Sequence, residues 1–290
     1  MKLHGKNYQN PELPLIVGID GGYVHAREGQ NRKAGSFEVI VGKSLQKEHK
    51  HKRFGFVSTY DTKSKRRLYE MLKSQGLQMN QQITFLSDGS DTVRNLQTYM
   101  SPNAEHILDW FQITMRLTVI NQITKGLTNK SLKKDFEEEL DSIKWYLWHG
   151  NTFKALESIE YLNNELDMND DENDQQSFST KEGNVKKLSK LMEEFYTYIE
   201  NNKNLVPNYG IKYYYGDIIS TAFVESTVNE IISKRMVKKQ QMRWTKKGAH
   251  LLLQLRVKNL NNELKDQFCK WYPSMVEHSD KVSCKTINVA

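Results

Sequence analysis

The spacing of apolar residues changes once along the chain, near Phe111, and this change constrains the fold more than any other feature. Before Phe111, short apolar or alternating runs predict strands, with helical spacing between some of them. The expected elements are strands at Leu13–Asp20, Ser36–Lys43 and Arg53–Tyr60, a helix at Thr62–Gly76, a strand that runs into a turn at Ile83–Asp91, a helix at Asp91–Met100 and, at Ala104–Phe111, a strand or a strand that merges into a helix. Three strands followed by alternating helix and strand predict an α/β fold, with a mixed sheet and helices on its faces.

After Phe111 the apolar residues recur three or four positions apart, which predicts an almost wholly helical chain. The expected helices are Ile113–Gly126, Leu132–His149, Thr152–Met168, Asn184–Asn201, Ser220–Met236 and Thr245–Phe268. Two segments interrupt them. Residues 167–182 are acidic and polar, which is typical of a solvated loop, and Pro207–Gly216 combines Pro, Gly and Tyr in a predicted ordered loop.

Composition excludes several classes of protein. The chain has 290 residues, of which 38% are hydrophobic, so it can bury the core of one large domain or two small ones. Its two cysteines, Cys269 and Cys284, provide neither a disulfide framework nor a zinc cluster of their own. No apolar run is long enough to span a membrane, and no apolar stretch follows Lys2 as in a secretory signal, so we expect a cytoplasmic protein.

Acidic residues stand at the predicted ends of three strands, at Asp20, Asp88 and Asp109. In sheets of this kind ligands bind beyond the strand ends, and carboxylates that converge there repel one another unless a cation lies between them. Oxygen ligands suit Mg²⁺ or Mn²⁺, and two such ions support phosphoryl transfer. For any single Asp-Gly, a simple turn is the competing interpretation. Asp91 is expected to be the N-cap of the helix that follows it.

Basic residues are concentrated near the C-terminus, although the formal net charge of the whole chain is only +7. Nine Lys or Arg residues fall between Lys234 and Lys258 with no acidic residue among them, which suits a phosphate backbone, although such a run also occurs on a solvated helix face. The candidate DNA-binding residues are Arg235, Lys238, Lys239, Arg243, Trp244, Lys246 and Lys247. A second cluster, Lys47–Arg53 with His49 and His51, is expected at a hairpin tip that touches DNA. The stripe Trp145, Tyr146 and Trp148 is expected to pack in the core.

Several longer segments resemble motifs of ISKra-type insertion-sequence transposases, in the same order along residues 13–273. They are GIDGGYV (18–24), LSDGSDTVRNL (86–96), HILDWFQITMRL (106–117), KWYLWHGN (144–151), PNYG (207–210), ISTAFVESTVNEIISKRMVKKQQMRW (219–244) and GAHLLLQLR (248–256). The resemblance implies a DDE transposase with a ribonuclease H-like sheet that is interrupted by an all-helical insertion.

The resemblance also implies roles for individual residues. Asp20 corresponds to the first catalytic acid and Glu225 to the last. Asp88 is favoured over Asp109 as the second acid, so that Asp20, Asp88 and Glu225 would hold two Mg²⁺ or Mn²⁺ ions while Asp109 supports the site. Gln112 stands where the family has His, and Asn229 lies one helical turn after Glu225; both are expected to support the site. Gln112 cannot take up a proton as His can.

The expected function is metal-dependent DNA cleavage and strand transfer, by a homo-oligomer that binds double-stranded transposon ends and target DNA at the bacterial nucleoid and has no membrane partner. The expected parts are an extension at 1–12, the first catalytic part at 13–112, the helical insertion at 113–218, the last catalytic helix and the basic helices at 219–273, and a tail at 274–290. The family's longer N-terminal region, thought to recognise transposon ends, is expected to be absent. Two alternatives stay open: a truncated or impaired relative that only binds DNA, and a nuclease acting on RNA or branched DNA.

Overall fold

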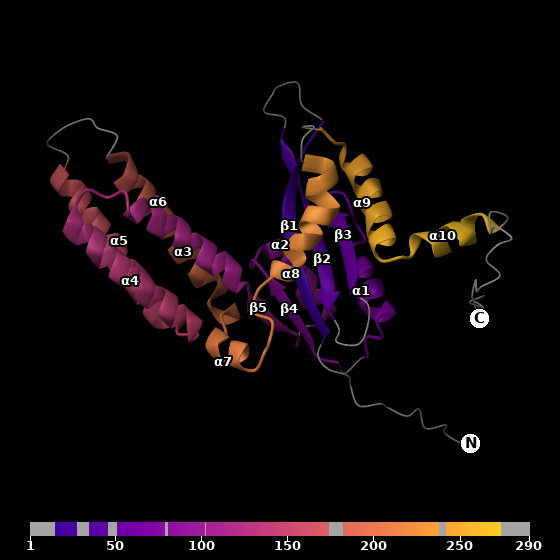
Figure 1. Ribbon diagram of the computed structural model, residues 1–290, viewed down its shortest axis with the longest axis horizontal. Helices are drawn as coiled ribbons and strands as arrows, with labels where there is room; N and C mark the ends of the chain where they lie inside the picture. The colour runs from indigo at the N-terminus through magenta and orange to yellow at the C-terminus, as the bar shows by residue number, and fades with distance from the viewer. Residues whose placement is uncertain are drawn as a thin grey trace, which may run out of the picture. The chain divides into compact units, whose positions relative to one another are not determined.

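The computed structural model describes residues 15–27, 35–45, 51–78, 81–101, 103–173, 182–237 and 242–273. It is an α/β structure whose five strands form one mixed sheet in the order β3-β2-β1-β4-β5 (Figure 1). The elements of this part are β1 (Leu15–His25), β2 (Ser36–Leu45), β3 (Lys52–Val57), α1 (Ser64–Ser74), β4 (Ile83–Ser87), α2 (Asp91–Met100) and β5 (Glu105–Leu108). The predicted order of strands and helices is confirmed.

Strand β1 is longer than the sequence predicts. The Asp-Gly-Gly segment was expected to end this strand in a turn, but Asp20, Gly21 and Gly22 pair with Val41, Ile40 and Val39 of the antiparallel strand β2. Pairing along both strands outweighs the turn preference of Asp-Gly, because backbone groups in a sheet are satisfied by hydrogen bonds between strands. Asp20 therefore lies inside β1 and not at its end.

By contact the chain divides into two compact units, of which the first comprises residues 1–84, 95–104 and 223–290. In this unit, residues of β1, β2 and β3 on one side of the sheet pack against the C-terminal helices. Their shared core contains Val24, Val39, Val41, Ile232 and Leu253. On the other side, Ser44 lies against Met71 and Gln75 at the end of α1. Helices therefore cover both faces of these three strands.

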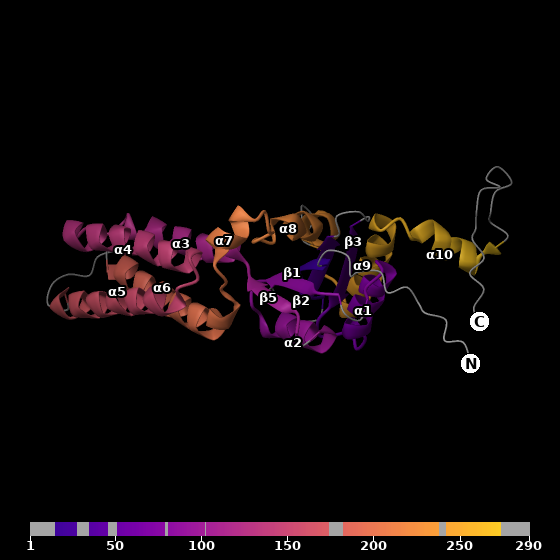
Figure 2. The same cartoon turned by 90° about the horizontal axis from the view of Figure 1, so that it is seen from below.

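The second unit comprises residues 85–94 and 105–222 and is mainly helical. Its helices are α3 (Trp110–Thr124), α4 (Lys130–Trp148), α5 (Thr152–Asn173), α6 (Glu182–Asn202), a short 3-10 turn (Lys203–Leu205) and α7 (Tyr209–Tyr214). Helices α3 to α6 run side by side as a bundle (Figures 1 and 2). The spacing of apolar residues explains this packing. On α4, residues three or four positions apart form one buried side of the helix: Leu132, Phe136, Leu140, Ile143 and Leu147.

Two predicted loops of this unit are helical in part. Helix α5 continues to Asn173, into the segment 167–182, while residues 174–181 lie outside the described residues. The segment Pro207–Gly216 contains α7, because the side chain of Asn208 accepts a hydrogen bond from the Ile211 amide and caps the helix. The loop predictions for these residues are wrong.

The predicted C-terminal helices are each divided in the structure. Instead of one helix at Ser220–Met236, α8 (Ala222–Val228) continues as a π-helical segment (Asn229–Val237). Instead of one helix at Thr245–Phe268, α9 (Lys246–Leu260) and α10 (Leu264–Trp271) are separated at Asn262, whose φ of 57° is incompatible with a helix. In the part of the chain that the structure describes, no helix has the length and apolar character needed to cross a membrane.

Candidate active site

Asp20 lies on the face of β1 that the C-terminal helices cover. Strand side chains alternate between faces, so Gly18, Asp20, Gly22 and Val24 share one face of β1. Val24 belongs to the core that contains Ile231 and Ile232 of the π-helical segment. Asp20 is half-buried, and one of its carboxylate oxygens accepts the Gly21 amide at 2.8 Å.

Two glycines let the helix that carries Glu225 come close to this face. A Cβ atom on Gly18 would lie 2.2 Å from a methyl group of Val224, and one on Gly22 would lie 3.1 Å from Ile232. Val224 is buried, whereas Glu225, the next residue, is exposed. Glu225 thus lies next to the residues of α8 that contact β1, which are Val224 and Val228. The helix that carries Glu225 therefore covers the face of β1 that carries Asp20, and the joint metal site of Asp20 and Glu225 stays a prediction.

This close contact predicts a specific loss of stability. Gly18→Ala is expected to lower the free energy of unfolding by about 1–3 kcal/mol, because the new Cβ cannot fit beside Val224 and Phe223. Gly21→Ala is the matched control, since its Cβ would point to the opposite face with its nearest neighbour at 3.5 Å. Urea unfolding of both variants measures the difference. Equal stability of the two variants would contradict the close approach of α8 to β1.

Asp88 directly follows β4, as predicted, and belongs to the second unit. Its carboxylate accepts the Ser90 amide at 3.0 Å, which shapes the turn into α2. Gly89 has φ +82°, and a Cβ there would lie 2.2 Å from the side-chain oxygen of Asn202, so only glycine fits. Asp91 is the first residue of α2 rather than the residue before it, so the N-cap prediction is wrong by one position. A polar cleft of about 760 Å³ opens here, lined in part by Ser90, Arg94, Arg116 and Tyr198.

Asp109 is completely buried and connects two segments of the second unit. One carboxylate oxygen accepts the amides of Phe111 at 2.9 Å and Thr221 at 3.1 Å, and the other accepts the Thr221 hydroxyl. A backbone hydrogen bond connects the same two segments, since the Trp110 amide donates to the Ile219 carbonyl. Burial raises the pKa of Asp109, against the effect of these hydrogen bonds. Asp109 caps α3 and holds residues 219–221, and this role was not apparent from the sequence.

His106, which is half-buried on β5, contacts the residue that precedes Asp88. Its ring nitrogen Nε2 lies 2.9 Å from the Ser87 hydroxyl, which in turn accepts the Gly89 amide. Burial lowers the pKa of His106 to about 4, and the positive charge of Arg94 acts in the same direction. Nothing in the sequence around His106 indicated this contact, because its partners come from another strand.

The pKa of His106 predicts a pH dependence of stability. Between about pH 6.5 and pH 4 the unfolded chain binds a proton at this position and the folded chain does not, so stability falls as the pH falls. We expect a loss of about 2 kcal/mol that His106→Asn does not show. The measurement is urea unfolding of both proteins at pH 7 and pH 5. The change in unfolding free energy between the two pH values is compared between the proteins, so that the contributions of other titrating groups cancel. An identical pH dependence in the variant would contradict the assignment.

The two predicted supporting residues lie in different units. Gln112 is half-buried on α3 and lines an apolar cavity of about 260 Å³ with Met115, Val119 and Phe195. Asn229 is half-buried and begins the π-helical segment in the first unit. The backbone amide of Gln112 donates to the Asp109 carbonyl at 3.1 Å, as part of the first turn of α3, and a supporting role of either side chain stays a prediction.

The predicted basic DNA-binding residues are described only in part. Lys238, Lys239 and the side chain of Arg235 lie outside the described residues, while Arg243, Lys246 and Lys247 are exposed. Trp244 is half-buried: its backbone hydrogen-bonds to His25, the last residue of β1, and to Arg27, and its ring packs against the core. Arg256 donates to the carbonyl oxygens of Glu230 and Ile231, so it stabilises the π-helical segment.

The second basic cluster contains residues that pair within the protein. Lys52 contacts Glu263 at 3.0 Å and Arg53 contacts Glu230 at 3.3 Å, while His49 lies outside the described residues. The backbone of Arg53 both donates to and accepts from the side chain of Asn261, which covers the exposed edge of β3. The expectation of a free hairpin tip is therefore wrong for Lys52 and Arg53.

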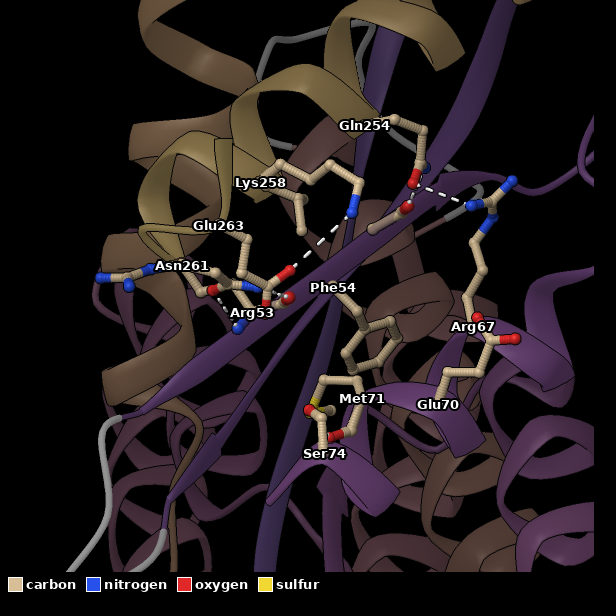
Figure 3. Close-up of a pocket in the computed structure, with 12 residues that line it drawn as sticks. Arg53, Phe54, Arg67, Glu70, Met71, Ser74, Gln254, Lys258, Asn261 and Glu263 are labelled. Carbon is tan, nitrogen blue, oxygen red and sulfur yellow. Dashed lines mark hydrogen bonds and ion pairs between the residues drawn. The ribbon is translucent and has the colours of Figure 1, made fainter. Parts of the chain in front are cut away.

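A small cavity of about 170 Å³ lies between β3, α1 and α9 (Figure 3). Its charged groups contact one another: Arg67 binds Gln254 at 3.0 Å and also Asp61, and Lys258 lies 3.9 Å from Glu263. These pairs connect the helices around the edge strand. The cavity therefore contributes to the structure of the first unit and contains none of the predicted catalytic residues.

The metal prediction rests on the chemistry of the donor groups. Among the described residues, no three His, Cys, Asp or Glu side chains gather into a ready-made metal site. Asp20, Asp88 and Glu225 nevertheless offer only carboxylate oxygens, which are the ligands that Mg²⁺ and Mn²⁺ prefer. Asp109 fits this role less well, because both of its oxygens already accept hydrogen bonds in the interior.

These features define an α/β protein with a five-stranded mixed sheet and a separate helical unit inserted in the chain. Comparison with models of known protein families finds no match, and a search of curated proteins finds none. The function is therefore inferred from the site and the sequence.

Proposed function

We propose that the chain is a DDE-type transposase with a ribonuclease H-like sheet, which cleaves DNA and joins strands with the help of two divalent cations. The observation that supports this proposal is the close approach of α8, which carries Glu225, to the face of β1 that carries Asp20. Gly18 and Gly22 allow the helical segment from Phe223 to Ile232 to contact β1 closely on both sides of Asp20. Asp88, at the end of the neighbouring strand β4, is the third proposed ligand.

Each residue has a defined part in this proposal. Asp20, Asp88 and Glu225 would hold the cations. Bound cations lower the pKa of a coordinated water molecule and stabilise negative charge on the phosphate. Arg243, which precedes α9, and Lys246 and Lys247 in its first turn are exposed and contact the DNA backbone without reading its sequence. Asp109 and Thr221 hold residues 219–221, the segment that precedes α8 in the chain.

The proposal is tested with purified full-length chain and a supercoiled plasmid that carries the DNA flanking the gene. We expect nicking and strand transfer in Mg²⁺ or Mn²⁺ and none after addition of EDTA. The DNA-end joining product, detected by sequencing, separates a transposase from a simple nuclease. Cleavage that is equally fast without divalent metal would overturn the proposal.

A second candidate function is DNA binding without catalysis. It is favoured by Gln112, which replaces the proton-accepting His expected from the resemblance, and by the absence of a ready-made metal cluster among the described residues. Salt-dependent binding of a labelled duplex, measured beside the cleavage assay, distinguishes the two functions. Binding that weakens with salt, together with no cleavage in either metal, would establish the second function.

A further inference from the structure

A group of large aromatic side chains is exposed on the second unit where α4, α5 and α7 meet. We call it the aromatic patch and define it as Trp145, Phe153, Tyr213, Tyr214 and Tyr215. Between 59% and 83% of each residue is exposed. The sequence predicted that Trp145 packs in the core, and this prediction is wrong, since Trp145 is 59% exposed.

Close packing beneath the patch connects the segments that carry it. Gly150, in the turn between α4 and α5, has φ +75°, and a Cβ there would lie 3.1 Å from the backbone of Pro207 and Asn208, just before α7. A Cβ on Gly210 would lie 2.8 Å from the indole nitrogen of Trp148. The end of α4, the turn and the start of α7 therefore pack against one another, which brings together the segments that carry the exposed rings.

A second layer of rings forms the base of the patch. Trp148 contacts Tyr213 at 6.0 Å and Trp110 at 5.0 Å between ring centroids. Tyr209 is fully buried and donates a hydrogen bond to the Leu108 carbonyl at 2.7 Å, which attaches α7 to β5. Exposed rings on such a rigid base lose little conformational freedom when a ligand stacks on them.

The chemistry of the patch favours nucleotides. Its large exposed side chains are rings, with Ile211 as the aliphatic neighbour, and every nucleobase has a face that stacks on a ring. Lys144 and Lys154 are exposed beside it, and no ion pair to either is found among the described residues. The ammonium of Lys154 lies 5.7 Å from the Tyr146 ring centroid. Rings that accept bases and cations that accept phosphates occur together.

We propose that the aromatic patch binds unpaired nucleotides of a DNA strand by stacking. The inference rests on the proposed function, since the strand is the substrate of that reaction. Paired bases in a duplex expose only their edges, so the patch distinguishes single-stranded from double-stranded DNA. It lies within one unit and includes none of the proposed metal ligands.

The test is equilibrium binding of a fluorescein-labelled oligothymidylate and a labelled duplex of the same length to the full chain. Trp145→Ala combined with Tyr214→Ala is expected to weaken binding of the single strand about tenfold to a hundredfold and to leave the duplex affinity within about twofold. Trp271→Ala is the matched control, because Trp271 is also 59% exposed but lies outside the patch. It is expected to change neither affinity.

Unchanged single-strand binding in the double variant would overturn the inference. So would reduced self-association in sedimentation with no change in DNA binding, because the patch would then be an interface between copies of the chain. Cleavage of duplex by the unaltered chain is measured separately. Failure of cleavage alone counts against the proposed function, whereas the single-strand affinity of the variants decides the role of the patch.

Discussion

Asp20→Asn is expected to slow metal-dependent strand cleavage about a thousandfold, which corresponds to ~4 kcal/mol of activation free energy. Asn keeps the size of the side chain and removes the charge that a divalent cation needs. Asp20 is only half-buried, and its β1 backbone pairs fully with β2, so the variant is expected to fold with nearly unchanged stability. The measurement is the rate of plasmid nicking in Mg²⁺, alongside a thermal unfolding curve.

Glu38→Gln is the matched control for this prediction. Glu38 on β2 pairs with Tyr23 on β1. A Cβ atom on Gly21 would lie 3.5 Å from the Glu38 carboxylate, so this carboxylate is on the face of the sheet opposite to Asp20. Its replacement is expected to leave the nicking rate unchanged. Glu225→Gln should lower the rate as much as Asp20→Asn, and the double variant should lower it little further, because ligands of one site act as a unit. Full activity of Asp20→Asn would show that Asp20 is no metal ligand.

The order of strands and helices could be predicted because it depends on local patterns. The buried apolar residues of β1, β2 and α4 recur with periods of two or near 3.6, and the sequence displays these periods directly. The predicted boundaries of elements were wrong where pairing with a segment distant in the sequence determines them. The turn preference of Asp20-Gly21-Gly22 is a local property, whereas its pairing with residues 39–41 is a property of the sheet.

The candidate site was predictable in its residue types but not in its supporting contacts. The metal-binding roles of Asp20 and Glu225 stay predictions, whereas Gly18 and Gly22 lie where the structure shows a close approach to β1. The bonds between Asp109 and Thr221 join residues 112 positions apart, so no local pattern reports them. The exposure of Trp145 was missed for a similar reason, since aromatic residues at helical spacing usually pack inside.

Asp109→Ala is expected to lower the free energy of unfolding by about 3–5 kcal/mol. The change leaves three donors without their acceptor in the interior: the amides of Phe111 and Thr221 and the Thr221 hydroxyl. Urea unfolding followed by tryptophan fluorescence measures the loss, because Trp110 is next to Asp109 in the chain and packs on Tyr209. A stable Asp109→Ala variant would show that these bonds do not hold residues 219–221.

Asp109→Asn separates this structural role from metal binding. The amide oxygen of Asn can accept the two backbone amides, and its NH₂ group can donate to the Thr221 hydroxyl, which also accepts hydrogen bonds. Because burial already raises the pKa of Asp109, a neutral side chain of the same shape should fit, with a loss of about 1 kcal/mol or less and cleavage within about threefold of the unaltered rate. Asp88→Asn should instead abolish cleavage. If folded Asp109→Asn lost cleavage while Asp88→Asn kept it, Asp109 and not Asp88 would be the second metal ligand.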